Sequence, residues 1–226
     1  MLRLRISKKL LIIAFLILFF SCISFQWVCA SEYPKPFPDE EINKYIGKVV
    51  DASVLNEIAM LIEKKYPDHL FAIIFKIIEA DTRWITDRGG QPTYEIKAHK
   101  ILIASIVDWG PKSPSDNTTP LWQYHYEVTL PGGYGAVHGN YYIQGVSVFE
   151  SATYWNVVSS SGGGTYIGVG LWNWNENLGR YHRYYDTPAW DTSYTWSYPA
   201  YYGHSVHNPQ GNPTVYFNVY YDWYYE

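Results

Sequence analysis

Cysteine is almost absent from this sequence, and what there is lies at one end. The two cysteines, Cys22 and Cys29, fall within the first thirty residues, and the following 196 residues have none. We expect those thirty residues to be removed from the mature protein. A mature chain without thiols excludes disulfide cross-links, thiol catalysis, iron–sulfur clusters and cysteine-ligated zinc.

The first thirty residues have the three parts of a secretory signal peptide. Basic residues between Arg3 and Lys9 precede an unbroken apolar run, Leu10–Phe20, and Val28-Cys29-Ala30 supplies the small residues that a signal peptidase recognises. We expect cleavage after Ala30 and export to the extracellular surface or medium. An uncleaved anchor is the alternative, but the 16 residues from Leu10 to Phe25 are short for a spanning helix of about 20 residues.

Positive charge is also scarce. Of the 17 lysine and arginine residues, four lie in the signal peptide, which leaves 13 against 21 aspartate and glutamate residues and a net charge of −8. A chain with this balance would repel nucleic-acid phosphates and anionic lipid headgroups. We therefore expect no nucleic-acid partner.

Recognisable catalytic motifs are missing too: there is no nucleophile elbow, zinc-protease helix or phosphate-binding loop. Glu79 and Asp81 form one candidate acid–base pair, which we interpret as acids at the end of a helix. The other candidate is a histidine pair with two aspartates to complete a metal site: His204, His207, Asp186 and Asp191. We interpret these histidines as surface residues of a loop, predict no metal and no cofactor, and favour a non-enzymatic function over an enzymatic one.

Aromatic residues are what the chain has in excess, and they are unevenly spread. Residues 31–120 hold 9 of them and residues 121–226 hold 28. The change falls at a segment with three prolines, 111–120, which also carries the glycosylation sequon at Asn117. The predicted organisation is a signal peptide (1–30), a mainly helical part (31–110), a linker (111–120) and an antiparallel β domain (121–226).

The part before the linker has helical patterns of different quality. Acidic residues after Asp39 predict a short helix, and apolar residues at helical spacing over 54–66 predict a second one that ends before Pro67. Residues 70–78 are apolar on nearly every side, which favours a buried helix over a strand. Residues 94–109 fit a long helix or a buried strand, and we interpret them as a strand.

After the linker the sequence predicts strands over 121–130, 141–149, 152–158, 165–174 and 214–225. Apolar and polar residues alternate cleanly in the first and last of these, as in half-buried antiparallel strands. Four prolines make 176–213 loop-like. We expect the C-terminal strand to pair within its own sheet; donation to a neighbouring molecule, giving filaments, is the alternative. The predicted fold class is α+β: a small N-terminal helical part packed on or preceding an antiparallel, aromatic-rich, β-sandwich-like domain.

The segment Val128–Asn175 has 48 residues and a single charged side chain, Glu150. A hairpin of 146–158 with 165–174 would have arms of the length that a membrane-spanning strand needs, about 9–11 residues. The side chains proposed for this membrane hairpin are Val146, Val148, Tyr154, Trp155, Tyr166 and Val169.

Aromatic rings also suit sugar faces, because tyrosine and tryptophan combine an apolar body with a polar tip. The candidates for ligand or surface contact are Trp172, Trp174, Trp190, Trp196, Tyr198, Tyr201 and Tyr202. The sequence thus predicts a secreted, non-enzymatic protein that binds cell surfaces or membranes, as an antimicrobial, bacteriocin-like toxin or an adhesin does. The expected partner is a cell-surface glycan, a membrane or a protein. An extracellular carbohydrate-binding module, a surface-layer or filament subunit, and a hydrolase with an unrecognised site are the alternatives.

Overall fold

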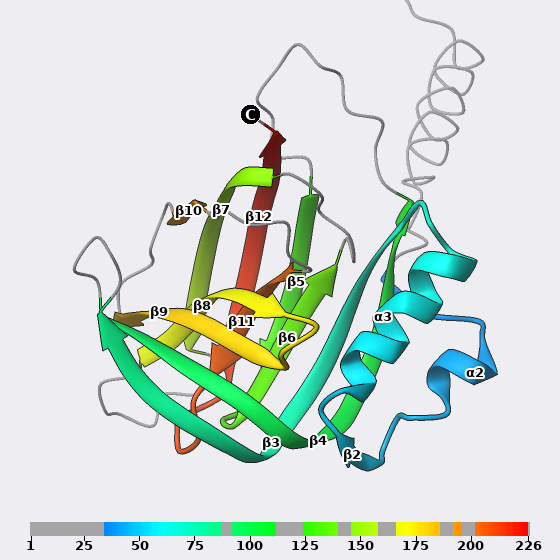
Figure 1. Ribbon diagram of the computed structural model, residues 1–226, viewed down its shortest axis with the longest axis horizontal. Coiled ribbons are helices and arrows are strands. Elements are labelled where there is room, and N and C mark those ends of the chain that lie inside the picture. Colours follow the sequence, from blue (N-terminus) through cyan, green and yellow to red (C-terminus); the bar gives the residue numbers. More distant parts are fainter. Residues whose placement is uncertain are drawn as a thin grey trace, which may run out of the picture. The chain divides into compact units, whose positions relative to one another are not determined.

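The computed structural model describes residues 34–86, 92–111, 124–139, 146–157, 166–185, 192–195 and 202–225. Its contacts group Pro34–Glu226 into one compact unit. The described part of this unit is mostly antiparallel β-structure, as Figure 1 shows. The described helices are α2 (Glu40–Asn43) and α3 (Val54–Lys65). The described strands are β1 (Lys35–Pro36), β2 (Val49–Asp51), β3 (His69–Thr86), β4 (Pro92–Pro111), β5 (Tyr124–Leu130), β6 (Tyr134–Gly139), β7 (Val146–Val157), β8 (Tyr166–Asn173), β9 (Leu178–Tyr185), β10 (Thr192–Thr195), β11 (Tyr202–Asn208) and β12 (Val215–Tyr225).

The larger sheet curls until it meets itself. Its strands follow the order β1-β4-β3-β6-β11-β8-β9, with β2 also on β4, and β4 pairs in addition with β9. This last pairing, of residues 93–97 with 178–182, joins β4, β3, β6, β11, β8 and β9 into a barrel-like sheet. The two faces of these strands therefore point inward and outward.

The smaller sheet has the order β10-β7-β12-β5 and packs on the outward face of the larger one. Buried side chains of β5 and β12, such as Val128 and Phe217, share a hydrophobic cluster with Val169 of β8 and Val206 of β11. The clean alternation predicted for 121–130 and 214–225 is confirmed over the described parts of both strands. Strand β12 is paired on both edges within its own chain, by β5 and β7.

The two predicted helices are present. The side chain of Asp39 accepts a hydrogen bond from the backbone N–H of Glu41 (2.8 Å) and so caps the start of α2. The apolar face of α3, with Leu55, Ile58 and Ile62, is fully buried in a cluster with side chains of β3 and β4.

The prediction of a helix over 70–78 was wrong, because these residues belong to β3. Phe71 and Phe75 join the cluster that α3 covers, whereas Leu70 and Ile74 lie against the cluster shared with the smaller sheet. A strand covered on both faces has no polar face, so its sequence resembles that of a fully buried helix. The described residues between 34 and 110 are accordingly mostly in strands, which corrects the expectation of a mainly helical part over 31–110. The interpretation of 94–109 as a strand is confirmed by β4.

The interpretation of 176–213 as loops was also wrong, since β9, β10 and β11 lie there. Of the four prolines, Pro209 and Pro213 lie between β11 and β12 and not within a strand, and Pro188 and Pro199 fall outside the described residues. Proline therefore marks the ends of these strands without excluding them.

Aromatic rings fill the inward face of the barrel-like sheet, and glycines on the facing strands leave them room. A Cβ added at Gly139 would lie 2.5 Å from the ring of Phe71, and one added at Gly168 would overlap the hydroxyl of Tyr94. Rings of Phe75 and Trp172 meet edge to face, with centroids 5.2 Å apart.

Candidate functional site

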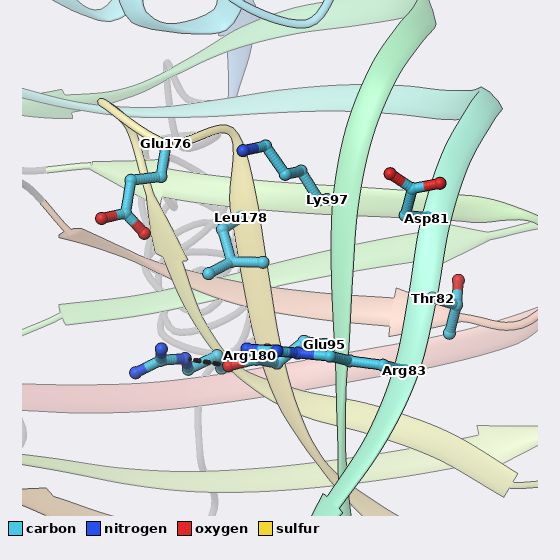
Figure 2. A pocket seen from close by; sticks show the side chains of 8 residues that line it. All are labelled: Asp81, Thr82, Arg83, Glu95, Lys97, Glu176, Leu178 and Arg180. Atoms are coloured by element: carbon cyan, nitrogen blue, oxygen red, sulfur yellow. Dashed lines mark hydrogen bonds and ion pairs between the residues drawn. The ribbon is translucent and has the colours of Figure 1, made fainter.

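A surface pocket of about 400 Å³ lies on the outward face of the sheet, where β3, β4 and β9 run side by side (Figure 2). Cross-strand register sets its composition: Arg83 is opposite Glu95, and Glu95 is opposite Arg180. Side chains at opposed positions share a face of the sheet. The lining residues are Asp81, Thr82, Arg83, Glu95, Lys97, Glu176, Leu178 and Arg180.

The floor of the pocket is a buried carboxylate held by two guanidinium groups. The Nε of Arg180 donates to Oε1 of Glu95 (2.5 Å), and the Nε of Arg83 donates to Oε2. The Glu95 side chain is only 3% exposed, whereas that of Arg83 is 71% exposed. Figure 2 shows the two arginines reaching Glu95 from either side.

The charge of Glu95 is stabilised by this arrangement. Burial acts to raise the pKa of the Glu95 carboxyl, but the hydrogen bonds and positive charges of Arg83 and Arg180 together outweigh it, and the pKa is lowered. Glu95 is therefore ionised at neutral pH, and both of its oxygens are occupied by arginine donors. Its role is to fix the two guanidinium groups in place.

A second cross-strand row forms one wall of the pocket: Asp81 is opposite Lys97, and Lys97 is opposite Leu178. Asp81 bonds instead to the Nε2 of His99, at 2.8 Å. The Lys97 side chain is exposed and, among the described residues, no hydrogen bond or ion pair holds its ammonium group. Lys97 is thus available to a ligand.

Glu176 enters the pocket from the turn between β8 and β9. The side-chain oxygen of Asn173 accepts the backbone N–H groups of Asn175 (3.0 Å) and Glu176 (3.1 Å), and Asn177 adopts the left-handed conformation with φ 53°. Local turn chemistry therefore holds Glu176 at the rim. The lining then has three positive groups, Arg83, Lys97 and Arg180, and three negative ones, Asp81, Glu95 and Glu176, so its net charge is zero.

The candidate metal pair His204 and His207 lies on β11, where an odd separation places two side chains on opposite faces. His204 bonds to the hydroxyl of Tyr126 in the smaller sheet (2.6 Å), and His207 to the hydroxyl of Tyr94 on the inward face (3.0 Å). Both are buried, so the interpretation as surface histidines was wrong as well. Asp186 and Asp191 lie outside the described residues.

No group of three or more histidine, cysteine, aspartate or glutamate side chains suited to a metal ion occurs among the residues that the structure describes. The acid–base candidates Glu79 and Asp81 lie on β3 and not at a helix end. Glu79 is 3.5 Å from the ammonium of Lys100, and Asp81 is bonded to His99. Each acid is thus matched with a basic partner at the surface.

The predicted ligand-contact residues separate into two groups. Trp172 and Trp174 are fully buried in contact with Phe75 and Phe71 of β3, which corrects the expectation that they face a ligand. Tyr202 begins β11, but its side chain lies outside what the structure describes. The remaining members of the set, and the sequon, fall outside the described residues: Trp190, Trp196, Tyr198, Tyr201 and Asn117.

The predicted membrane hairpin is not formed, because its two arms belong to different sheets. Strand β7, which includes Val146, Val148, Tyr154 and Trp155, pairs with β10 and β12. Strand β8 pairs with β9 and β11. The other two hairpin candidates lie on β8, where Val169 is fully buried and Tyr166 is partly buried. In the described part of the chain, no helix combines the length and apolar character needed to cross a membrane.

The pocket residues were not among the sequence-based site candidates, apart from Asp81. Arg83, Glu95 and Arg180 are brought together by strand register across 98 positions of sequence, and no motif marks them. Comparisons with protein-family models, with curated protein sequences and with solved structures gave no match. The function therefore has to be inferred from the site.

Proposed function

We propose that the protein is exported and binds a cell surface without catalysing a reaction, and that its ligand is an uncharged glycan held in the pocket on β3, β4 and β9. The observation that carries this proposal is the charge-balanced lining, in which a buried glutamate fixes two arginines. Such preorganisation reduces the entropy lost when a ligand is bound.

The chemistry of the lining matches sugar hydroxyl groups, each of which donates one hydrogen bond and accepts others. Lys97 and the exposed end of Arg83 supply donors, and the carboxylate of Glu176 supplies acceptors. With three charges of each sign, the pocket offers no net attraction to phosphate or sulfate groups. An uncharged polyhydroxylated ligand therefore suits it better than an anionic one.

The state of Glu95 favours binding over acid–base catalysis. A general acid must carry a proton and reach the substrate. Glu95 has a lowered pKa, is buried, and uses both oxygens to hold arginines. The membrane-binding version has lost its sequence-based motivation, since the arms of the expected hairpin pair with other strands.

The test is a screen of the purified secreted protein against immobilised neutral oligosaccharides, followed by affinity measurements in solution. We expect Lys97→Met to weaken binding at least about tenfold, a loss of about 1.4 kcal/mol. The matched control is Lys100→Met on the same strand, because Lys100 pairs with Glu79 outside the pocket. Its affinity should match that of the unaltered protein. Failure of every neutral glycan to bind, or equal losses in the two variants, would overturn the proposal.

A further inference from the structure

Trp84 is a large aromatic side chain that β3 leaves in contact with solvent. It is 54% exposed, whereas Trp172 and Trp174 are fully buried. Leaving so much apolar surface in water forgoes the stabilisation that burial provides. The indole ring is thus available to a partner.

The Trp84 ring is held in a fixed orientation by a stack of side chains. The guanidinium carbon of Arg183 lies 5.0 Å from the centroid of the Trp84 ring and 3.9 Å from that of the Tyr166 ring. Tyr94 approaches the indole from within the sheet, with centroids 5.3 Å apart. Contacts between a cation and aromatic rings stabilise such stacks even at exposed positions. The ring is therefore a preorganised platform.

The platform and the pocket lie on opposite sides of one strand edge. Arg83 and Trp84 are consecutive in β3, so their side chains point to opposite faces of the sheet. The N–H of Ile77 bonds to the carbonyl of Gly133 (3.1 Å). Beyond that point β3 pairs with β4 alone among the described strands, since its pairing with β6 covers only residues 71–76. A chain-like ligand can therefore pass around this edge.

We propose that Trp84 is a second sugar-binding position. The ligand is a neutral oligosaccharide: one part of it occupies the pocket, and the next part stacks on the indole ring of Trp84. This inference rests on the proposed function, since it deepens the same recognition site. Sugar rings present an apolar face of C–H groups that packs on an exposed indole. Arg183 and Tyr166 act as positioning residues that hold the platform. Two linked contacts bind a long ligand more tightly than either contact alone.

The experiment compares a neutral hexasaccharide that binds in the screen with the monosaccharide of the same sugar. Trp84→Ala should weaken hexasaccharide binding at least about tenfold and leave monosaccharide binding unchanged, whereas Lys97→Met should weaken both. Trp84→Phe keeps an aromatic ring and should recover part of the hexasaccharide affinity. Ile78→Ala is the matched control, since it removes an exposed apolar side chain from the same strand.

Arg183→Met should lower hexasaccharide affinity less than Trp84→Ala does and leave the monosaccharide unaffected; a merely structural role would not distinguish the two ligands. If Trp84→Ala leaves hexasaccharide binding intact, or weakens the two ligands equally, the second position is refuted while the pocket proposal stands. If no saccharide binds at all, both proposals fail together.

Discussion

The two faces of the β3–β4–β9 segment bury polar groups in opposite ways. On the outward face, Glu95 is charged and is matched by two arginines. On the inward face, uncharged groups bond to one another: the hydroxyl of Tyr94 to Nδ1 of His207 (3.0 Å), and the hydroxyl of Tyr181 to Oγ of Ser205 (2.9 Å). Both solutions satisfy groups that would otherwise be costly to bury.

On both faces burial disfavours the charged form of an ionisable group, but the hydrogen-bonding partners of the buried groups differ. On the inward face burial raises the pKa of Tyr94 and Tyr181 and lowers the pKa of His207 to about 3, so all three stay neutral near pH 7. On the outward face the arginines overcome the same effect at Glu95. The outward face therefore buries a charge that two arginines match, whereas the buried Tyr94, Tyr181 and His207 on the inward face stay neutral.

Acidification should lower the free energy of unfolding more than any substitution below, because it favours protonation of the buried, neutral histidines. Burial lowers the pKa of His204 and His207 to about 3, below the ordinary value of 6.5. The unfolded chain therefore takes up protons below about pH 6.5 that the folded protein binds only near pH 3, and stability falls as the pH falls through this window. At pH 5 we expect a loss of about 2 kcal/mol per histidine, or about 4 kcal/mol for the pair.

Urea unfolding at a series of pH values measures this loss. The ion-paired Glu95 has a lowered pKa, so its contribution should disappear only below about pH 4.5, as the pH falls through the folded-state pKa. His99→Gln removes an exposed histidine and is the control that should leave the slope between pH 7 and pH 5 unchanged. A flat stability profile over that range would show that the buried histidines are not held neutral.

Overpacking of the inward face should cause the next largest loss of stability. An added Cβ in Gly168→Ala would overlap the Tyr94 hydroxyl, and we expect a loss of about 1–3 kcal/mol. Gly135→Ala is the milder comparison, because its nearest neighbour is a ring carbon of Phe75 at 3.1 Å. Thermal unfolding of the two variants should rank Gly168→Ala as the less stable; the reverse order would contradict the packing described for this face.

Disruption of the ion pairs on the outward face should lower the free energy of unfolding by less than overpacking of the inward face does. Glu95→Gln removes the negative charge between two arginines, and we expect a loss of about 1–2 kcal/mol, since one charge-assisted bond is weakened and one is lost. Asp81→Asn should cost less than about 0.5 kcal/mol, because that carboxylate is exposed. Equal losses in the two variants, measured by chemical unfolding, would mean that burial of Glu95 has no energetic consequence.

The sequence predicts elements that have a polar side better than strands that are covered on both faces. Strands β5 and β12 and helix α3 have a polar side, so their periodicity is visible. Strand β3 lacks one over residues 70–78, because α3 covers one of its faces and the smaller sheet the other. The charged pocket is invisible in sequence for a different reason: Arg83, Glu95 and Arg180 become neighbours only through the register of three strands.

Hydrogen exchange of the protein with and without a neutral oligosaccharide tests the central claim most directly, because it reports which strands meet the ligand. The two-face account predicts slower exchange at 81–86 of β3, at 92–97 of β4 and in the turn before Leu178. Strands β5 and β12 of the smaller sheet should be unaffected. Protection confined to the smaller sheet, with no change in β3 or β4, would contradict the assignment of ligand binding to the β3–β4–β9 segment.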